Sequence, residues 1–107
     1  MNFRVIITDN AKANLRQYYL RAADSAPETA ARWLNRFQEV LQSLSSQPQR
    51  CALAPENQAV DEEVRQFIFG NRTGTYRALF SIDKDEIRVL HIRRAAMDVA
   101  TADELYG

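Results

Sequence analysis

The chain has 107 residues, 46% of them hydrophobic, which suffices for one domain over residues 1–107 with a single core but not for two domains. Its 14 basic and 14 acidic residues give a formal net charge of zero, which argues against a protein that coats nucleic acid. The sequence shows neither a secretory signal nor an apolar run of membrane-spanning length, so we expect a soluble, cytoplasmic protein with no membrane partner. The lone Cys51 permits no internal disulfide, which fits a reducing compartment.

The first half of the chain predicts a short strand followed by two helices. Residues 3–7 form a β-branched run, and Thr8 is a candidate N-cap for a first amphipathic helix of about four turns. Ser25 and Glu28 have the spacing of a capping box for a second helix, whose apolar stripe extends to Leu44. We expect the two helices to form an antiparallel hairpin.

The second half predicts a polar connection, three strands and a short terminal helix. Residues 45–63 lack apolar periodicity and are rich in Ser, Gln and Pro, which is typical of a connecting segment. Strands are expected over residues 64–69, 75–83 and 86–94, and a Thr-x-x-Glu pattern from Thr101 predicts the last helix. The order β-α-α-β-β-β predicts an α+β fold in which an antiparallel sheet carries the two-helix hairpin on one face.

The last two strands form a predicted hairpin that fixes which side chains share a face. A two-residue turn at Lys84 and Asp85 sets the cross-strand pairs, which are Ile82 with Ile87, Phe80 with Val89, and Leu79 with Leu90. Alternation then places one set on the core face: Tyr76, Ala78, Phe80, Ile82, Ile87, Val89 and His91. The opposite face receives a set that is both cationic and apolar: Arg77, Leu79, Ser81, Arg88, Leu90, Ile92 and Arg94.

This opposite face is predicted to bind a partner. Residues 64–96 carry seven basic and three acidic side chains, and twelve of the fourteen basic residues of the chain are arginine, which suits bidentate contacts with phosphate or carboxylate. An apolar centre with a cationic rim is typical of a surface that binds an amphipathic, acidic segment. The candidate binding residues are Arg77, Leu79, Arg88, Leu90, Ile92 and Arg94.

Few residues are candidates for chemistry. His91, the only histidine, is expected to be a buried, hydrogen-bonded residue on the core face, although a slip of one residue in the register would reverse its direction. Arg77 is either paired with the acidic tail or available to a target, and Arg93 and Arg94 are either a solvated strand end or target contacts. We find no metal-ligand spacing, Ser/His/Asp set or nucleotide fingerprint, so we expect no metal and no cofactor.

Three stretches that follow the helical hairpin resemble a known family: Arg65-Gln-Phe-Ile-Phe-Gly70, Gly74-Thr-Tyr-Arg-Ala-Leu-Phe80 and Val89-Leu-His-Ile-Arg-Arg94. In this order the chain resembles the RelE/ParE superfamily of bacterial toxins from type II toxin–antitoxin modules, over nearly its whole length. The resemblance implies a cytoplasmic toxin that arrests growth and serves plasmid stabilisation. It also implies a cognate antitoxin as partner, with operator DNA contacted only through that antitoxin. The superfamily contains ribosome-dependent mRNA endoribonucleases and ParE-type toxins that poison DNA gyrase.

The residues favour the ParE-like branch, because the RNase constellation is incomplete. The resemblance assigns the central arginine of RelE-type RNases to Arg77, but it also requires lysines on the preceding strand, where this chain has Phe67, Ile68 and Phe69. We therefore expect a protein that inhibits DNA gyrase by binding rather than an enzyme. Two alternatives stay open: a metal-independent mRNA endoribonuclease with Arg77 as its catalytic residue, and a non-toxic member that retains only antitoxin binding.

Overall fold

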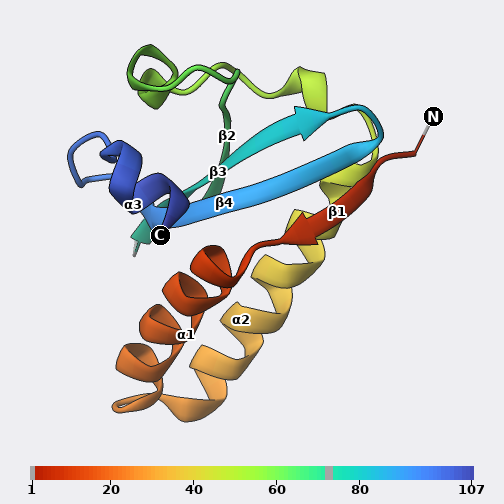
Figure 1. The fold of residues 1–107 in the computed structure, drawn as a ribbon. Coiled ribbons are helices and arrows are strands. Elements are labelled where there is room, and N and C mark those ends of the chain that lie inside the picture. The colour runs from red at the N-terminus through yellow and green to blue at the C-terminus, as the bar shows by residue number, and fades with distance from the viewer. Residues whose placement is uncertain (1, 72–73) are drawn as a thin grey trace.

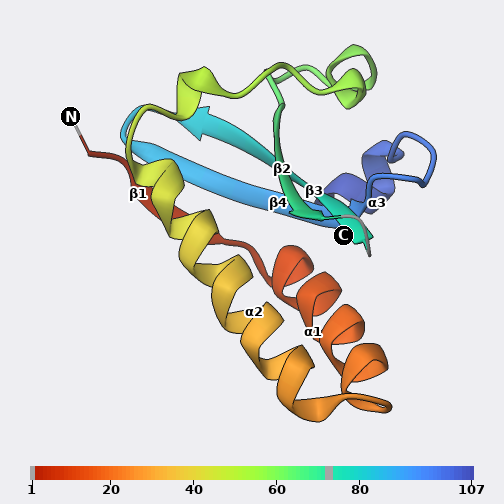
Figure 2. The same cartoon turned by 180° about the vertical axis from the view of Figure 1, so that it is seen from behind.

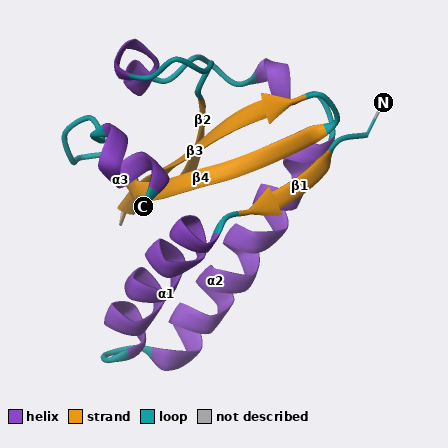
Figure 3. Cartoon of the chain, in the orientation of Figure 1, coloured by secondary structure: helices purple, strands orange, loops and turns teal. Residues whose placement is uncertain are grey.

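The computed structural model describes residues 2–71 and 74–107 and has the expected order of elements (Figures 1 and 3). A first strand, β1 (Arg4–Ile7), leads into two helices, α1 (Asp9–Ala23) and α2 (Pro27–Gln42). Three short 3₁₀ turns follow, at Ser43–Ser45, Pro48–Arg50 and Pro55–Ala59. The chain ends with β2 (Arg65–Asn71), β3 (Gly74–Asp83), β4 (Glu86–Arg94) and α3 (Ala102–Tyr106). The α+β class and the order β-α-α-β-β-β are confirmed.

The helix starts follow the sequence signals at two of three places. Thr8 caps α1 and Thr101 forms the expected capping box of α3. The capping box predicted from Ser25 and Glu28 is wrong, because Ala26 is the N-cap of α2 and makes no side-chain cap. The amides of this connection donate instead to carbonyls in the last turn of α1, so Ser25 belongs to the end of α1.

One mixed sheet carries the helical hairpin on a single face (Figures 1 and 2). The strand order is β1-β4-β3-β2, and β1 runs parallel to β4 while the other neighbours are antiparallel, so the sheet is not wholly antiparallel. The main core lies between sheet and hairpin and includes Ala11, Leu15, Phe37, Leu41, Leu44, Ala78, Phe80, Ile87, Val89 and Ile92. In the described part of the chain, none of the helices combines the length and apolarity that crossing a membrane requires.

A β-bulge divides the pairing of β3 with β4 into two parts. The predicted pairs next to the turn are confirmed: Ile82 with Ile87, and Phe80 with Val89. The register then shifts, so that Leu79 pairs with His91 and the predicted pair of Leu79 with Leu90 is wrong. A bulge sets two residues of one strand opposite one of its neighbour. Each residue of β4 after Leu90 therefore lies on the face opposite to the predicted one.

Candidate functional site

The chain itself covers the sheet face that was predicted to be an open binding surface. The 3₁₀ turn Pro55–Ala59 and the C-terminal segment with α3 lie over this face, away from the helical hairpin (Figure 1). Together they build a second apolar cluster from Ala54, Val64, Leu79, Leu90, Ala100 and Leu105. Such a cluster removes apolar side chains from water in the way that a partner protein would.

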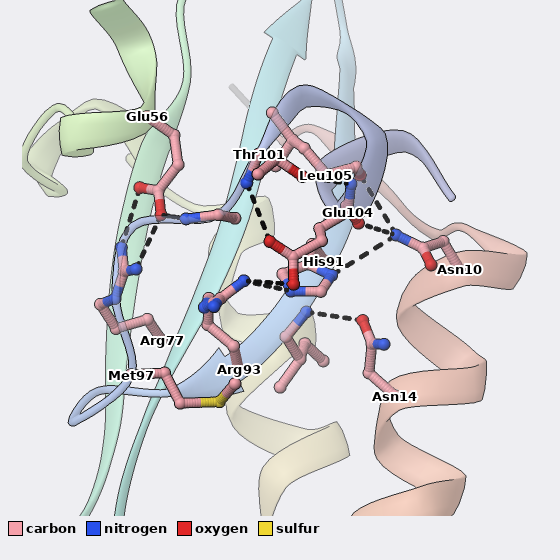
Figure 4. Close-up of polar contacts among 12 residues, drawn as sticks. Asn10, Asn14, Glu56, Arg77, His91, Arg93, Met97, Thr101, Glu104 and Leu105 are labelled. Atoms are coloured by element: carbon pink, nitrogen blue, oxygen red, sulfur yellow. Dashed lines mark hydrogen bonds and ion pairs between the residues drawn. The ribbon is translucent and has the colours of Figure 1, made fainter. Parts of the chain in front are cut away.

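A buried ion pair lies at the centre of the covered face (Figure 4). Arg77 donates to the carboxylate of Glu56 through both terminal nitrogens, with Nη1–Oε1 at 2.9 Å and Nη2–Oε2 at 2.7 Å. Nη1 also donates to Oε1 of Gln66 at 3.0 Å, and the amide of Ala100 donates to Oε2 of Glu56 at 2.8 Å. Burial alone would raise the pKa of Glu56, but the hydrogen bonds from Arg77 and Ala100 lower it to about 2. The pair is therefore fully charged at neutral pH.

His91 and Arg93 form a second polar group beside this pair (Figure 4). Nη1 of Arg93 lies 3.3 Å from Nε2 of His91 and 3.4 Å from Oε2 of Glu104. A guanidinium only donates hydrogen bonds, so Nε2 of His91 accepts and the ring is neutral. Burial, and then the charge of Arg93, lower the pKa of His91 in agreement with this assignment. Among the described residues, Nε of Arg93 is a buried nitrogen without a hydrogen-bond partner.

Polar contacts hold the C-terminal segment over the Arg77–Glu56 ion pair and over the group formed by His91 and Arg93. The side-chain amide of Asn10, at the start of α1, donates to the carbonyls of Leu90 and Glu104, each at 2.9 Å. The hydroxyl of Tyr106 donates to the carboxylate of Glu62, and burial followed by this carboxylate raises the pKa of Tyr106 to about 12. The segment therefore connects α1, β4 and the connection that precedes β2.

The six predicted binding residues do not form one exposed surface. Four of them are buried: Arg77, Leu79, Leu90 and Ile92. The bulge places Ile92 in the main core and pairs Arg94 with Tyr76, so the prediction that these two residues share a face with Arg77 is wrong. Only Arg88 and Arg94 are exposed, and they lie on opposite faces.

The outcome for the histidine is mixed. His91 is buried and hydrogen bonded as predicted, but it lies on the face of Leu79 rather than on the helix-covered face. Arg93, expected to be a solvated strand end or a target contact, is only 4% exposed and shares this face. From the sequence, a slip of one residue in the register would turn His91 to the other face. The β-bulge produces this slip.

Glu56 is a central residue that was not anticipated from the sequence. The acidic tail was one of two alternatives predicted for Arg77, the other being a target, whereas the actual carboxylate comes from the polar connection. Its only sequence signal is an isolated carboxylate in a segment without periodicity, which identifies neither burial nor a partner. Gln66, on β2, shares the same Arg77 nitrogen and was also missed.

The buried charged and polar side chains of this face make hydrogen bonds and ion pairs with one another. Within residues 2–71 and 74–107, no three His, Cys, Asp or Glu side chains gather in a way that would hold a metal ion. Burial raises the pKa of the Cys51 thiol, which disfavours its reactive thiolate. With Arg77 bound to Glu56 and His91 only 7% exposed, neither of these two side chains is open to a substrate, and their contacts stabilise the fold.

Comparison with known proteins identifies the family. The family model of the ParE toxin of the type II toxin–antitoxin system parDE matches residues 5–99. This chain belongs to the ParE toxin family. A solved structure of the chromosomal ParDE toxin–antitoxin system from P. aeruginosa shares the fold, with a TM-score of 0.68 and 24% identity over 86% of this chain and 95% of that chain. A comparison with curated proteins finds no match. Membership of the ParE family makes the chain a toxin of the type II class and implies an antitoxin partner.

Proposed function

We propose that this ParE-family toxin acts in the cytoplasm by binding and inhibiting DNA gyrase, and that a cognate antitoxin neutralises it. In the RelE/ParE superfamily, poisoning of gyrase is the activity of the ParE-type branch, to which the family match assigns the chain. The structural observation that carries the proposal is the bidentate ion pair of Arg77 with Glu56.

This ion pair disfavours the alternative activity, mRNA cleavage. Metal-free RNA cleavage needs a cation that stabilises the negative charge developing on the phosphate. Arg77 stands where RelE-type RNases have their central arginine, yet its side chain is only 9% exposed and its terminal nitrogens are held by Glu56. Releasing Arg77 would leave two buried charges unpaired, which is costly. Inhibition by binding requires no such release.

A pair of assays tests the proposal. Purified protein is added to a gyrase supercoiling reaction and, separately, to translating ribosomes whose mRNA is mapped for cuts. We expect loss of supercoiling, with relaxed or cleaved plasmid, and intact mRNA. Prior addition of the cognate antitoxin should restore supercoiling. Cuts positioned by codon in ribosome-bound mRNA would contradict the proposal and support an endoribonuclease. Inactivity in both assays with antitoxin binding retained would indicate a non-toxic member.

A further inference from the structure

A cleft lies on the covered face of the sheet, between α3, the start of α1 and β4. It has a volume of about 310 Å³, and Leu90 and Leu105 give it apolar walls. The side-chain amide of Asn10 donates to the carbonyls of Leu90 and Glu104, each at 2.9 Å, and so connects three sides of the cleft (Figure 4). The cleft is therefore held open by the packing and hydrogen bonds of the fold itself.

A buried hydroxyl group opens into this cleft. Ser81, on β3, lines the cleft and is only 3% exposed. Within residues 2–71 and 74–107, the Ser81 hydroxyl makes no hydrogen bond with another protein group. A buried polar group without a partner costs free energy, and for this reason nearly all such groups in folded proteins are paired. The Ser81 hydroxyl can therefore offer a hydrogen bond to a polar group that enters the cleft.

The charges around the cleft favour a cation. Asp9 of α1 and Glu62 of the connection before β2 line the cleft, and neither makes an ion pair with a described residue. Glu62 accepts a hydrogen bond from the hydroxyl of Tyr106, whose pKa of about 12 keeps this hydroxyl neutral. Arg88 is the cation among the described residues of the lining, and its Nε already donates to Glu86 at 3.4 Å. An anion would meet two carboxylates here, whereas a cation would bind to them.

We propose that this cleft binds an arginine or lysine side chain on the surface of DNA gyrase. The inference rests on the proposed function, because it takes gyrase as the partner. An enzyme that acts on DNA carries many such side chains where it holds the phosphates. The methylene stem packs against Leu90 and Leu105. The cationic head group donates to the carboxylates of Asp9 and Glu62 and to the hydroxyl of Ser81.

The first arm of the test fills the cleft or removes its charge. Purified gyrase is titrated with the full chain, and both its affinity and the loss of supercoiling are measured. Ser81→Met fills the cleft and Glu62→Gln removes one carboxylate charge, so each should weaken gyrase binding about tenfold or more. Glu63→Gln is the matched control, since it makes the same change in a carboxylate that pairs with Arg65 outside the cleft, and it should not alter the affinity. Thermal melts establish that the variants fold, and the exposed Glu62 keeps the test valid if Ser81→Met does not.

The second arm separates the outcomes. Added salt should weaken gyrase binding by the unmutated chain more than by Glu62→Gln, because salt screens the charge that this variant lacks. Unchanged gyrase affinity in folded Ser81→Met and Glu62→Gln would overturn the inference and leave the proposed function intact. Variants that lose affinity for the antitoxin but not for gyrase would assign the cleft to the antitoxin instead. Binding of N-acetylarginine amide in the cleft, with gyrase affinity equal in all variants, would assign it to a free small molecule. Failure of the unmutated chain to bind gyrase would contradict the proposed function itself.

Discussion

Glu56→Gln tests whether the buried ion pair holds the covered face together. Glutamine keeps the size of the side chain but removes its charge, which leaves Arg77 buried beside a neutral amide. Breaking a buried pair from one side costs about 3–5 kcal/mol. That is a large part of the roughly 5–15 kcal/mol by which such a domain is stable. At about 4 °C per kcal/mol for a chain of this length, the Tm should fall by about 12–20 °C.

The assays are urea unfolding and thermal melts at neutral pH, both followed by circular dichroism, with two companion variants. Glu63→Gln breaks the pair of an exposed carboxylate with Arg65, 3.0 Å away, and should cost less than about 1 kcal/mol. Glu56→Leu combined with Arg77→Met removes both charges and should be more stable than Glu56→Leu alone. A loss below about 1 kcal/mol for Glu56→Gln, or strictly additive losses in the double variant, would refute the reasoning.

The carboxyl group of Glu56 should make the free energy of unfolding depend on pH. Its pKa is about 2 in the folded protein and 4.5 ordinarily, so the unfolded chain takes up the proton first as the pH falls. The contribution of the charged Glu56 to the stability of the fold is thus complete above pH 4.5 and is lost as the pH falls toward 2. A depression of this size corresponds to about 3 kcal/mol. Glu56→Gln should lose stability less steeply than the unmutated protein across this range, and equal slopes would exclude Glu56 as the titrating group.

Three further substitutions test other parts of the fold. Gly70→Ala should cost about 2 kcal/mol or more in thermal melts, because φ is +127° and a Cβ would lie 2.1 Å from the carbonyl oxygen of Gly74. Thr101→Ala removes the capping box of α3 and should cost about 1 kcal/mol, with faster amide exchange confined to the C-terminal segment. His91→Gln should cost about 1 kcal/mol for a disturbed buried hydrogen bond. Because burial and then Arg93 lower the pKa of His91, the unmutated protein should lose stability as the pH falls below 6.5, and His91→Gln should lose less in paired unfolding curves.

The helices and the main core were predictable because their apolar spacing has one interpretation. Along α2 the apolar residues recur every three or four positions, and two of them, Phe37 and Leu41, are completely buried. The Thr-x-x-Glu pattern at the last helix was equally informative, because its capping bonds are local in sequence. Signals of this kind depend on neighbours within one or two turns and do not require the tertiary structure.

The bulge and the ion pair depend on distant contacts, and the sequence does not reveal them. Leu79 and Phe80 are adjacent, point to opposite faces and are both fully buried, so alternation within this strand does not reveal that the face of Leu79 is covered as well. The covered face is itself a consequence of the connection before β2 folding back over the sheet. Glu56 gives no periodic signal, since one carboxylate in a polar segment looks the same whether it is solvated or paired with Arg77.

The parallel pairing of β1 with β4 has a consequence for synthesis of the protein. Arg4 lies opposite Glu86, and the hydroxyl of Thr8 donates to the carbonyl of Val89 at 2.8 Å. The first of these strands to leave the ribosome therefore finds its partner only after residues 86–89 have been made. A nascent chain that stops before β4 lacks the strand that joins β1 to β3, and with it the core residues Ile87, Val89 and Ile92. Translation that stops before β4 therefore yields fragments that lack the complete fold, and any activity that depends on this fold waits for the synthesis of β4.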